Sequence, residues 1–358
     1  MTTARAALRP VGGPTPDVVD ALRGWLAADD PDPVVIETSG STGAPKRVVL
    51  GRPAVLASVA ATAARLGAQG RWLLTLPPSY VAGLQVVVRS LVAGHEPVLA
   101  GDHATFADAT RALGDAPRFT SLVPTQLHRL LGPDADPADR AALLTYETVL
   151  LGGGPVDPEL RGRAADAGVR LVATYGMSET AGGCVYDGVP LDGVRLAIGD
   201  DARVRIAGPV LFDGYEGDPA LTAEVLHDGW FTTSDLGELR DGRLRILGRA
   251  DDVLVTGGVK VPAPVVAARL AAHPAVTTAV VVGAPDAEWG QRLVAFVVGE
   301  VALDEARDWV AEVHPRSWAP REVRCVPGLP LTDRGKVDRA TLEAWAAGPP
   351  GRGVGEAW

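Results

Sequence analysis

Short apolar runs alternate with amphipathic stretches over the first two thirds of the chain. Six runs read as buried strands because each is a short, nearly continuous apolar segment: residues 33–37, 71–77, 97–100, 119–124, 147–153 and 169–176. Between them, helical spacing of apolar residues occurs near 53–67, 83–93, 104–113, 124–132 and 157–167. This repeat of strand, helix and strand predicts a layered α/β fold with mainly parallel strand pairing.

The pattern changes near Val194. Strands punctuated by turns follow, and the dipeptide Asp241-Gly242 is a strong signal for a tight hairpin. A small α+β pattern comes next, with helices and strands expected near residues 263–272, 276–283, 292–298 and 303–312. We therefore expect a large N-terminal domain, a hinge and a small C-terminal lid domain, over residues 1–248, 249–252 and 253–358.

Composition and charge narrow the class of protein. A hydrophobic fraction of 47% with 22% charged residues is ordinary for a globular protein. The net charge of −10 argues against broad binding to nucleic acid or anionic membranes, which needs a basic surface. We see no signal segment and no long uncharged apolar run, and two cysteines are too few for a disulfide framework. We expect a cytoplasmic protein without membrane insertion, and its six scattered histidines predict no zinc site.

The stretch TSGSTGAPK, from Thr38 to Lys46, follows a predicted buried strand. Its lysine is unusual, because the chain has only three lysines among its 34 Lys and Arg residues. Glycines that present backbone N–H groups, hydroxyl donors and a compact cation can together hold a phosphate chain. The Walker pattern is absent, since Pro45 precedes the lysine and Arg47 follows it. A flexible surface loop is the alternative.

Four further segments carry candidate chemistry. TYGMSETAGG, over residues 174–183, offers Glu179 as a hard oxygen ligand for Mg²⁺ and an aromatic face for a nucleotide base. Asp235 in GWFTTSDLGEL could hold ribose hydroxyls, although a capping role would also explain it. LGRADDVLVTGGVKV ends at Lys260, and LPLTDRGKVDR places Lys336 on a glycine-bearing loop. Each segment is ambiguous by itself.

In this order, from Thr38 to Arg339, the five segments resemble those of the adenylate-forming superfamily, which includes acyl- and aryl-CoA ligases, peptide-synthetase adenylation domains and luciferases. The resemblance implies a large layered α/β domain with a β-rich subdomain, followed by a small mobile α+β domain. It also implies ATP, Mg²⁺ and CoA as ligands. The residues matched to ATP or AMP binding are Ser39, Gly40, Ser41, Thr42, Gly43, Gly153, Gly154, Thr174, Tyr175, Gly176, Ser178, Asp235 and Arg249.

The resemblance further implies a two-step reaction. A carboxylate attacks the α-phosphate of ATP, which gives an acyl-adenylate and pyrophosphate, and a thiol then displaces AMP. Lys336 would bridge the carboxylate and the adenylate, Lys46 would hold the departing phosphates, and Glu179 would carry Mg²⁺. The small domain would then turn about Asp251 and bring the Gly257-Gly258 turn to the CoA tunnel.

One branch of the superfamily is more closely similar. Only 37 residues precede Thr38, and this compactness resembles the actinobacterial form of the o-succinylbenzoate–CoA ligases of menaquinone biosynthesis. Their arginine-bearing helix matches residues 76–94, which implies that Arg89 binds the distal carboxylate of the acid. The residues matched to the acid site are Tyr80, Arg89, Gly153 and Met177. The helical wheel leaves a solvated role open, because Gln85 and Arg89 share the polar edge of an apolar face.

The match departs from the branch at three positions. Many relatives have histidine where Tyr80 stands and a small hydroxyl residue where Ala82 stands, and the usual acidic residue after Lys260 appears as Pro264. Three alternatives stay open: another acyl- or aryl-CoA ligase, an enzyme that loads a carrier-protein thiol, and a non-catalytic nucleotide-binding protein. The expected partners are small molecules and not nucleic acid, and the superfamily often forms homodimers.

Overall fold

The computed structural model describes residues 8–38, 45–154, 156–250, 253–331 and 337–348. Packing divides the chain into two compact units. The first consists of Met1–Leu196, Arg205–Thr232 and Arg240–Leu244, and the second of Ala197–Val204, Thr233–Leu239 and Arg245–Trp358. The boundary between the two units crosses strands of one sheet and does not fall at a single point of the chain. The hinge at residues 249–252 therefore stays a prediction.

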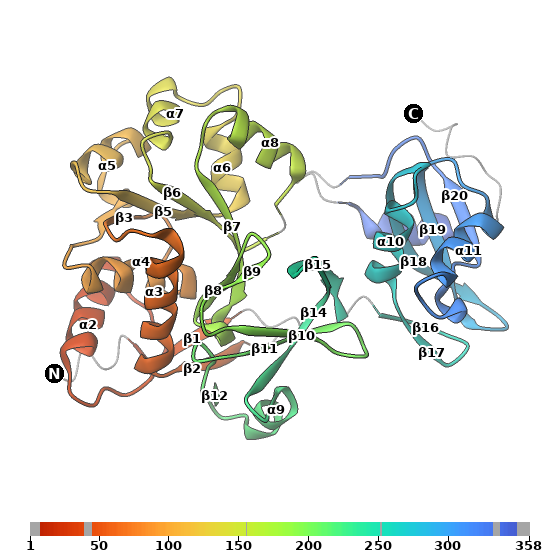
Figure 1. Ribbon diagram of the computed structural model, residues 1–358, viewed down its shortest axis with the longest axis horizontal. Helices are drawn as coiled ribbons and strands as arrows, with labels where there is room; N and C mark the ends of the chain where they lie inside the picture. Colours follow the sequence, from red (N-terminus) through yellow and green to blue (C-terminus); the bar gives the residue numbers. More distant parts are fainter. Residues whose placement is uncertain (1–7, 39–44, 155, 251–252, 332–336, 349–358) are drawn as a thin grey trace. The chain divides into compact units, whose positions relative to one another are not determined.

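A seven-stranded sheet forms the centre of the first unit, in the order β4-β3-β5-β6-β7-β8-β9 (Figure 1). Pairing is parallel from β4 through β7 and antiparallel from β7 to β9. The predicted α/β fold with mainly parallel pairing is confirmed. The strands are Arg71–Leu74 (β3), Val98–Leu99 (β4), Arg118–Leu122 (β5), Thr148–Leu151 (β6), Leu171–Met177 (β7), Gly182–Tyr186 (β8) and Val189–Pro190 (β9).

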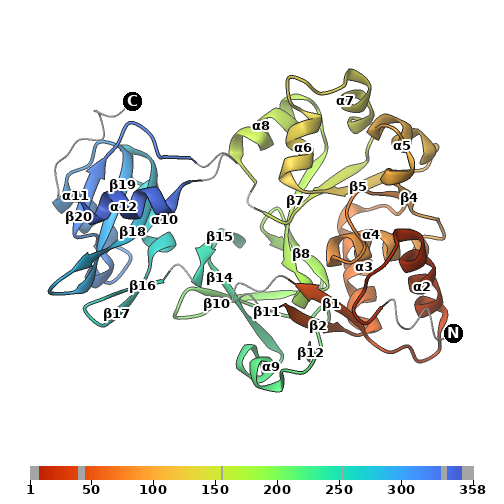
Figure 2. The same ribbon diagram turned by 180° about the vertical axis from the view of Figure 1, so that it is seen from behind.

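Helices lie on both faces of this sheet (Figures 1 and 2). On one face, α5 to α8 form a single buried apolar cluster with strand residues such as Leu73 and Val149. On the other face, α4 packs on β3 and β5, and α2 and α3 pack on α4. The sequence predicted all of these helices except α2 and α7. Their bounds are Thr15–Ala27 (α2), Arg52–Leu66 (α3), Val81–Val92 (α4), Phe106–Ala112 (α5), Pro124–Leu130 (α6), Pro137–Leu143 (α7) and Pro158–Asp166 (α8).

The predicted strand at residues 33–37 lies outside the parallel sheet, which corrects its expected place. It is β1 (Val34–Thr38), and it pairs antiparallel with β2 (Lys46–Leu50), which in turn pairs antiparallel with β12 (Gly214–Tyr215). The register places Thr38 opposite Lys46. The short connection between β1 and β2 permits a hairpin, whereas a parallel crossover needs a dozen residues or more.

The turn-rich part of the chain forms a five-stranded sheet in the order β10-β11-β14-β13, with β15 beside β14. Asp241 and Gly242 have φ angles of 51° and 73°, which confirms the predicted tight hairpin between β14 and β15. The elements here are Arg195–Ile198 (β10), Arg203–Ala207 (β11), Pro219–Val225 (α9), Leu226–His227 (β13), Trp230–Arg240 (β14) and Arg243–Arg249 (β15).

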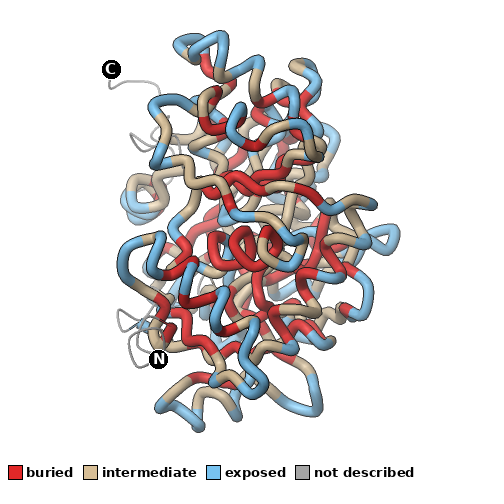
Figure 3. The backbone as a smooth tube through the Cα atoms, turned by 90° about the vertical axis from the view of Figure 1, so that its left-hand side faces the viewer, coloured by how far each residue is buried: buried red, intermediate tan, exposed pale blue. Residues whose placement is uncertain are grey.

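The second unit has its own α+β core, as the sequence predicted. Helices α10 and α11 pack with the sheet β18-β19-β20 around residues such as Val281 and Ala295, and α12 packs with the sheet around Phe296. Buried residues, red in Figure 3, alternate with exposed ones along much of the chain. The elements are Val253–Thr256 (β16), Val259–Pro262 (β17), Ala263–Ala271 (α10), Val276–Asp286 (β18), Gly290–Gly299 (β19), Leu303–Ala311 (α11), Glu322–Cys325 (β20) and Arg339–Ala347 (α12).

Candidate active site

Lys46 and Glu179 both lie next to one buried tyrosine, although 133 positions separate them in the chain. The Lys46 ammonium lies 5.4 Å from the centre of the Tyr215 ring. The Tyr215 hydroxyl donates a 2.8 Å hydrogen bond to Glu179 Oε1. Burial, together with the adjacent Glu179 carboxylate, raises the pKa of Tyr215, so the phenol stays protonated and donates. The structure thus brings together the ends of two segments that the sequence singled out separately.

Tyr215 itself was missed by the sequence reasoning. It lies in the short strand β12, whose pairing with β2 places Tyr215 opposite Val48. Its backbone N–H donates to Thr222 Oγ1 at 2.8 Å, which ties the strand to α9. No spacing in the sequence signals this contact, because it depends on strand pairing between remote segments.

Arg47, next to Lys46, has a different environment. Its guanidinium forms ion pairs with Glu216 at 2.6 Å and with Glu37 at 3.5 Å, and Glu216 also pairs with Arg9 at 2.5 Å. These contacts hold β1, β2 and the residue after β12 together. Arg47 is therefore engaged with protein carboxylates, which leaves Lys46 as the cation beside Tyr215.

A tight turn follows β7 and carries Glu179. The turn is the 3₁₀ helix η2 (Ser178–Thr180), and Thr180 Oγ1 bonds the Met177 N–H at 3.0 Å and the Gly182 carbonyl at 2.8 Å. Ala181 has a φ of 49°, in the left-handed region. A Cβ at Gly176 would lie 2.1 Å from the Gly182 carbonyl oxygen, so the close approach of β7 and β8 requires glycine there.

The glycines predicted to face the nucleotide end strand β6, as expected. A Cβ at Gly152 would lie 2.5 Å from Thr174 Oγ1, which itself donates to the Leu151 carbonyl at 3.2 Å. Gly153 has a φ of 78°. The end of β6 and the predicted nucleotide residues of β7 therefore lie side by side. Thr174, Tyr175 and Gly176 lie within β7, inside the strand that the sequence predicted at residues 169–176.

In the second unit, the structure brings Asp235 and Arg249 together. Asp235 Oδ1 accepts from Arg249 Nη1 at 3.4 Å, across the neighbouring strands β14 and β15. The Asp235 side chain is only 16% exposed, and its N–H is bonded by Thr233 Oγ1 at 3.0 Å. Asp235 lies inside β14, so the capping role left open by the sequence does not apply. Both residues were matched to the nucleotide.

Arg89 is buried, which excludes the solvated role that the helical wheel left open. Residues 83–90 of α4 are all buried, and Gln85 and Arg89 are only 1% and 6% exposed. Val92, at the end of the same helix, is 45% exposed. The wheel was wrong because a second layer covers the polar edge: Gln85 Nε2 donates to the Ala181 carbonyl at 2.8 Å, and Arg89 Nη2 to Thr62 Oγ1 at 3.2 Å.

The charge of Arg89 has no carboxylate beside it among the residues that the structure describes. Its guanidinium lies 5.0 Å from the centre of the Trp72 ring, and its Nε has no hydrogen-bond partner within the described part of the chain. Burial lowers the pKa of Arg89, and the neighbouring Tyr186 hydroxyl opposes this in part. An arginine nevertheless stays protonated in proteins, so α4 carries a buried positive charge for which the described part of the chain supplies no anion.

The other predicted positions are less informative. Tyr80 is 58% exposed at the start of α4. Gly257 and Gly258 form the β16–β17 turn with φ angles of 53° and 78°, and a Cβ at Gly257 would lie 2.4 Å from the Trp289 ring. Several predicted residues lie outside the described part of the chain: Ser39, Gly40, Ser41, Thr42, Gly43, Asp251 and Lys336.

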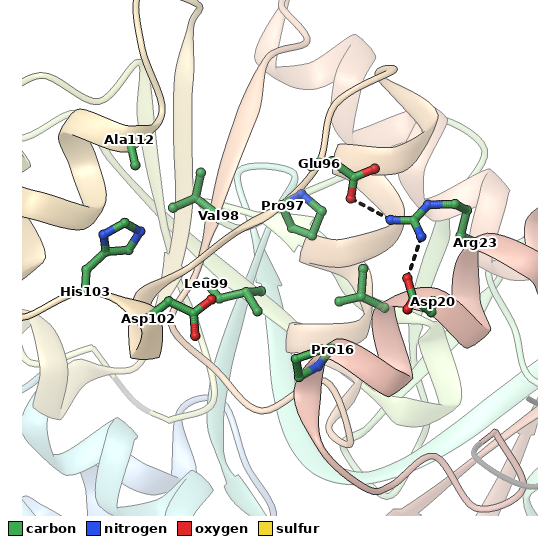
Figure 4. A pocket seen from close by; sticks show the side chains of 11 residues that line it. Pro16, Asp20, Arg23, Glu96, Pro97, Val98, Leu99, Asp102, His103 and Ala112 are labelled. Atoms are coloured by element: carbon green, nitrogen blue, oxygen red, sulfur yellow. Dashed lines mark hydrogen bonds and ion pairs between the residues drawn. The ribbon is translucent and has the colours of Figure 1, made fainter.

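Figure 4 shows a surface pocket that no sequence motif indicated. Arg23 of α2 bridges Asp20 and Glu96 at its rim, with nitrogen-to-oxygen distances of 2.5 and 2.6 Å. Its wall is partly apolar, with Val19 and Leu99 among the residues that line it. None of the predicted site residues lines this pocket.

Two other kinds of feature are absent from the described ranges. No helix there is long and apolar enough to cross a membrane. No group of three or more His, Cys, Asp or Glu residues there could hold a metal ion without other ligands.

Sequence and structure comparisons agree on the class of protein. The AMP-binding enzyme family matches residues 22–216, and the C-terminal domain of AMP-binding enzymes matches residues 266–336. The chain therefore belongs to the AMP-binding enzyme family, and the resemblance read from its five segments is confirmed. The predicted adenylate-forming fold, with a large and a small domain, is confirmed as well.

Particular relatives narrow the comparison. The chain is 45% identical to a probable 2-succinylbenzoate–CoA ligase of Mycobacterium tuberculosis, over 92% of this chain and 89% of that protein. Wild-type E. coli MenE with a bound OSB-AMS analogue matches with a TM-score of 0.66 and 29% identity, over 87% of this chain and 68% of that one. The o-succinylbenzoate CoA synthetase of Bacillus subtilis, in complex with the intermediate OSB-AMP, matches with a TM-score of 0.59 and 27% identity. This match covers 86% of this chain and 68% of that one.

Proposed function

We propose that the chain is an ATP-dependent o-succinylbenzoate–CoA ligase of menaquinone biosynthesis. It forms o-succinylbenzoyl-AMP and pyrophosphate from the acid and ATP, and then o-succinylbenzoyl-CoA and AMP from the adenylate and CoA. The names of its relatives support this substrate. The single observation of its own that carries the proposal is Arg89, a buried cation with no carboxylate beside it among the residues that the structure describes.

The substrate has two carboxylates, and the proposal gives each a different task. One reacts with ATP, and the other must enter the protein as an unreactive anion. An unpaired buried charge is strongly disfavoured, so the distal carboxylate and the Arg89 guanidinium each supply what the other lacks. Met177 and Gly153, near the Glu179 turn and at the end of β6, would then lie along the body of the acid.

The nucleotide would lie at the ends of β6 and β7. Thr174, Tyr175, Gly176, Ser178 and Gly154 would face AMP, and Asp235 with Arg249 would hold the ribose. Lys46 would attract the pyrophosphate that leaves, with the Ser39–Gly43 loop around it. Because the reaction joins two anions, these fixed cations and donors lower the barrier chiefly by electrostatic stabilisation and by positioning.

Glu179 fits the role of a Mg²⁺ ligand. The Tyr215 hydrogen bond occupies Oε1 and leaves Oε2 for a metal. Mg²⁺ is usually bound by one or two carboxylates together with substrate phosphates, so a single protein carboxylate suffices when ATP supplies the other oxygens. The ion would neutralise phosphate charge during adenylation.

The remaining parts of the proposal follow the superfamily. Lys336 would act in adenylation, and a turn of the small domain about Asp251 would replace it with the Gly257-Gly258 turn for CoA. Two glycines with positive φ at that turn leave backbone that a long thiol could approach closely. We also propose a cytoplasmic enzyme that forms a homodimer.

A panel of carboxylic acids tests the function directly. AMP and pyrophosphate release would be measured with each acid, with CoA present and absent. We expect o-succinylbenzoate to give the highest kcat/KM and an acyl-CoA product. A preference for monocarboxylic or amino acids would contradict the proposal, and adenylate formation without transfer to CoA would favour a carrier-protein thiol instead.

A further inference from the structure

Arg89 has a buried environment of neutral groups, contributed by three elements other than its own helix. Thr62 of α3 accepts a hydrogen bond from Arg89 Nη2 at 3.2 Å. The Thr62 hydroxyl also lies 3.0 Å from the Tyr186 hydroxyl of β8. Trp72 of β3 presents its ring to the guanidinium at 5.0 Å. Thr62 and Tyr186 are only 1% and 2% exposed, so water does not compete for these contacts.

The two hydroxyls can fix the guanidinium without neutralising it. A threonine hydroxyl has two acceptor sites and one donor, so Thr62 can bond Arg89 and Tyr186 at the same time. An aspartate or glutamate at either position would orient the arginine as well, but would also satisfy its charge. Holding a buried arginine through hydroxyls and an aromatic ring leaves its attraction for an external anion intact.

We infer that Thr62 and Tyr186 are positioning residues that orient Arg89 toward the distal carboxylate of the acid. The inference rests on the proposed function, since it assigns the arginine to that carboxylate. Neither hydroxyl takes part in the chemistry at the reacting carboxylate. Their effect is therefore expected in the binding of dicarboxylic acids and not in the rate of adenylation.

Tyr186→Phe and Thr62→Val remove the two hydroxyls separately. Because one well-placed hydrogen bond is worth about 0.5–1.5 kcal/mol, each variant should raise the KM for o-succinylbenzoate by about 3- to 10-fold. The kcat and the KM for ATP should stay within about twofold of wild type. A neutral analogue, in which an amide replaces the distal carboxylate, should show no change in KM.

Three further variants sharpen the test. Thr62→Ser keeps the hydroxyl and should restore the wild-type KM. Thr62→Asp adds a carboxylate beside Arg89 and should raise the KM for the dicarboxylic acid more than Thr62→Val does. Tyr146→Phe is the matched control, because Tyr146 is also buried and lies 2.9 Å from a threonine hydroxyl, that of Thr110, in the cluster formed by α5 to α8. It should leave every kinetic constant unchanged.

The outcomes separate the inference from the proposed function. One outcome is that Arg89→Met raises the KM for o-succinylbenzoate and leaves the KM for the amide analogue unchanged, while Tyr186→Phe and Thr62→Val change neither KM. In that case the positioning role is wrong and the proposed function stands. If Tyr186→Phe weakens both acids equally, its hydroxyl supports the fold only, and the inference is overturned. If Arg89→Met itself affects both acids equally, the assignment of the distal carboxylate fails and the inference fails with it.

Discussion

Two clusters in the first unit place a tyrosine hydroxyl beside a charged side chain, and they differ in how the charge is balanced. At Tyr215, an ammonium lies near the ring and a carboxylate accepts from the hydroxyl, so charges of both signs are present. At Tyr186, the guanidinium of Arg89 is the charged group, and its contacts within the described ranges are with the neutral side chains of Thr62 and Trp72. The first arrangement is typical of a site for a ligand with its own counter-ion. The second predicts a ligand that is itself an anion.

The difference shows when a buried charge indicates a binding site. A buried ion pair is weak evidence of function, because it can be structural and its partners satisfy each other. A buried charge without an opposite charge costs folding free energy, so its presence calls for an explanation outside the free protein. Arg47 is partly exposed, and its two carboxylates satisfy its charge, whereas Arg89 illustrates the second case.

The largest effect is expected at the Tyr215 cluster. Glu179→Gln keeps a hydrogen-bond acceptor for Tyr215 but removes the charge that suits a hard dication. We expect kcat to fall by about 100-fold or more at fixed Mg²⁺. Mutating a residue that only hydrogen-bonds a metal ligand already lowers metal affinity or activity by about 10- to 100-fold. ATP–pyrophosphate exchange across a Mg²⁺ titration measures this. A variant with wild-type Mg²⁺ dependence would exclude Glu179 as the metal ligand.

A smaller effect is expected for Tyr215→Phe. The variant keeps the ring beside Lys46 and removes only the hydroxyl that fixes Glu179, so the metal site loses orientation but not charge. We expect the Mg²⁺ concentration at half-maximal exchange to rise about 10-fold. Mn²⁺ binding in the presence of ATP, followed by electron paramagnetic resonance, gives a second readout that does not depend on turnover. If Tyr215→Phe and the control Tyr146→Phe weakened metal binding equally, the loss of any buried hydroxyl would explain the effect. The orienting role of Tyr215 would then be wrong.

The smallest effect concerns stability at the other cluster. Arg89→Met replaces the arginine by an unbranched apolar side chain that is shorter and carries no charge. Removing a buried charge that lacks a carboxylate should leave the free energy of unfolding unchanged or raise it by about 1–2 kcal/mol. Urea denaturation without ligands measures this. If the free energy of unfolding fell by about 3 kcal/mol or more, Arg89 would be a residue that stabilises the fold through its contacts.

The sequence predicted more of the fold than of the contacts at the site. Periodicity located most strands and helices of both units, and the order of five motifs identified the family, because both are properties of continuous segments. The pairing of β1 with β2 and the contact of Tyr215 with Glu179 were not predicted. The resemblance implied a pocket position for Arg89, but the helical wheel by itself left a solvated position open. Each depends on segments that are remote in the chain or on a second layer over a helix, and a helical wheel describes only the helix itself.

Arg89→Met tests the central claim most directly, through kcat/KM for o-succinylbenzoate and for its distal amide analogue. A charge-assisted hydrogen bond from arginine is worth about 1.5–3 kcal/mol, so the variant should lose about 10- to 150-fold with the dicarboxylic acid. It should lose almost nothing with the neutral analogue, which wild type should use poorly. Equal losses with the two acids, or no loss with either, would contradict the account.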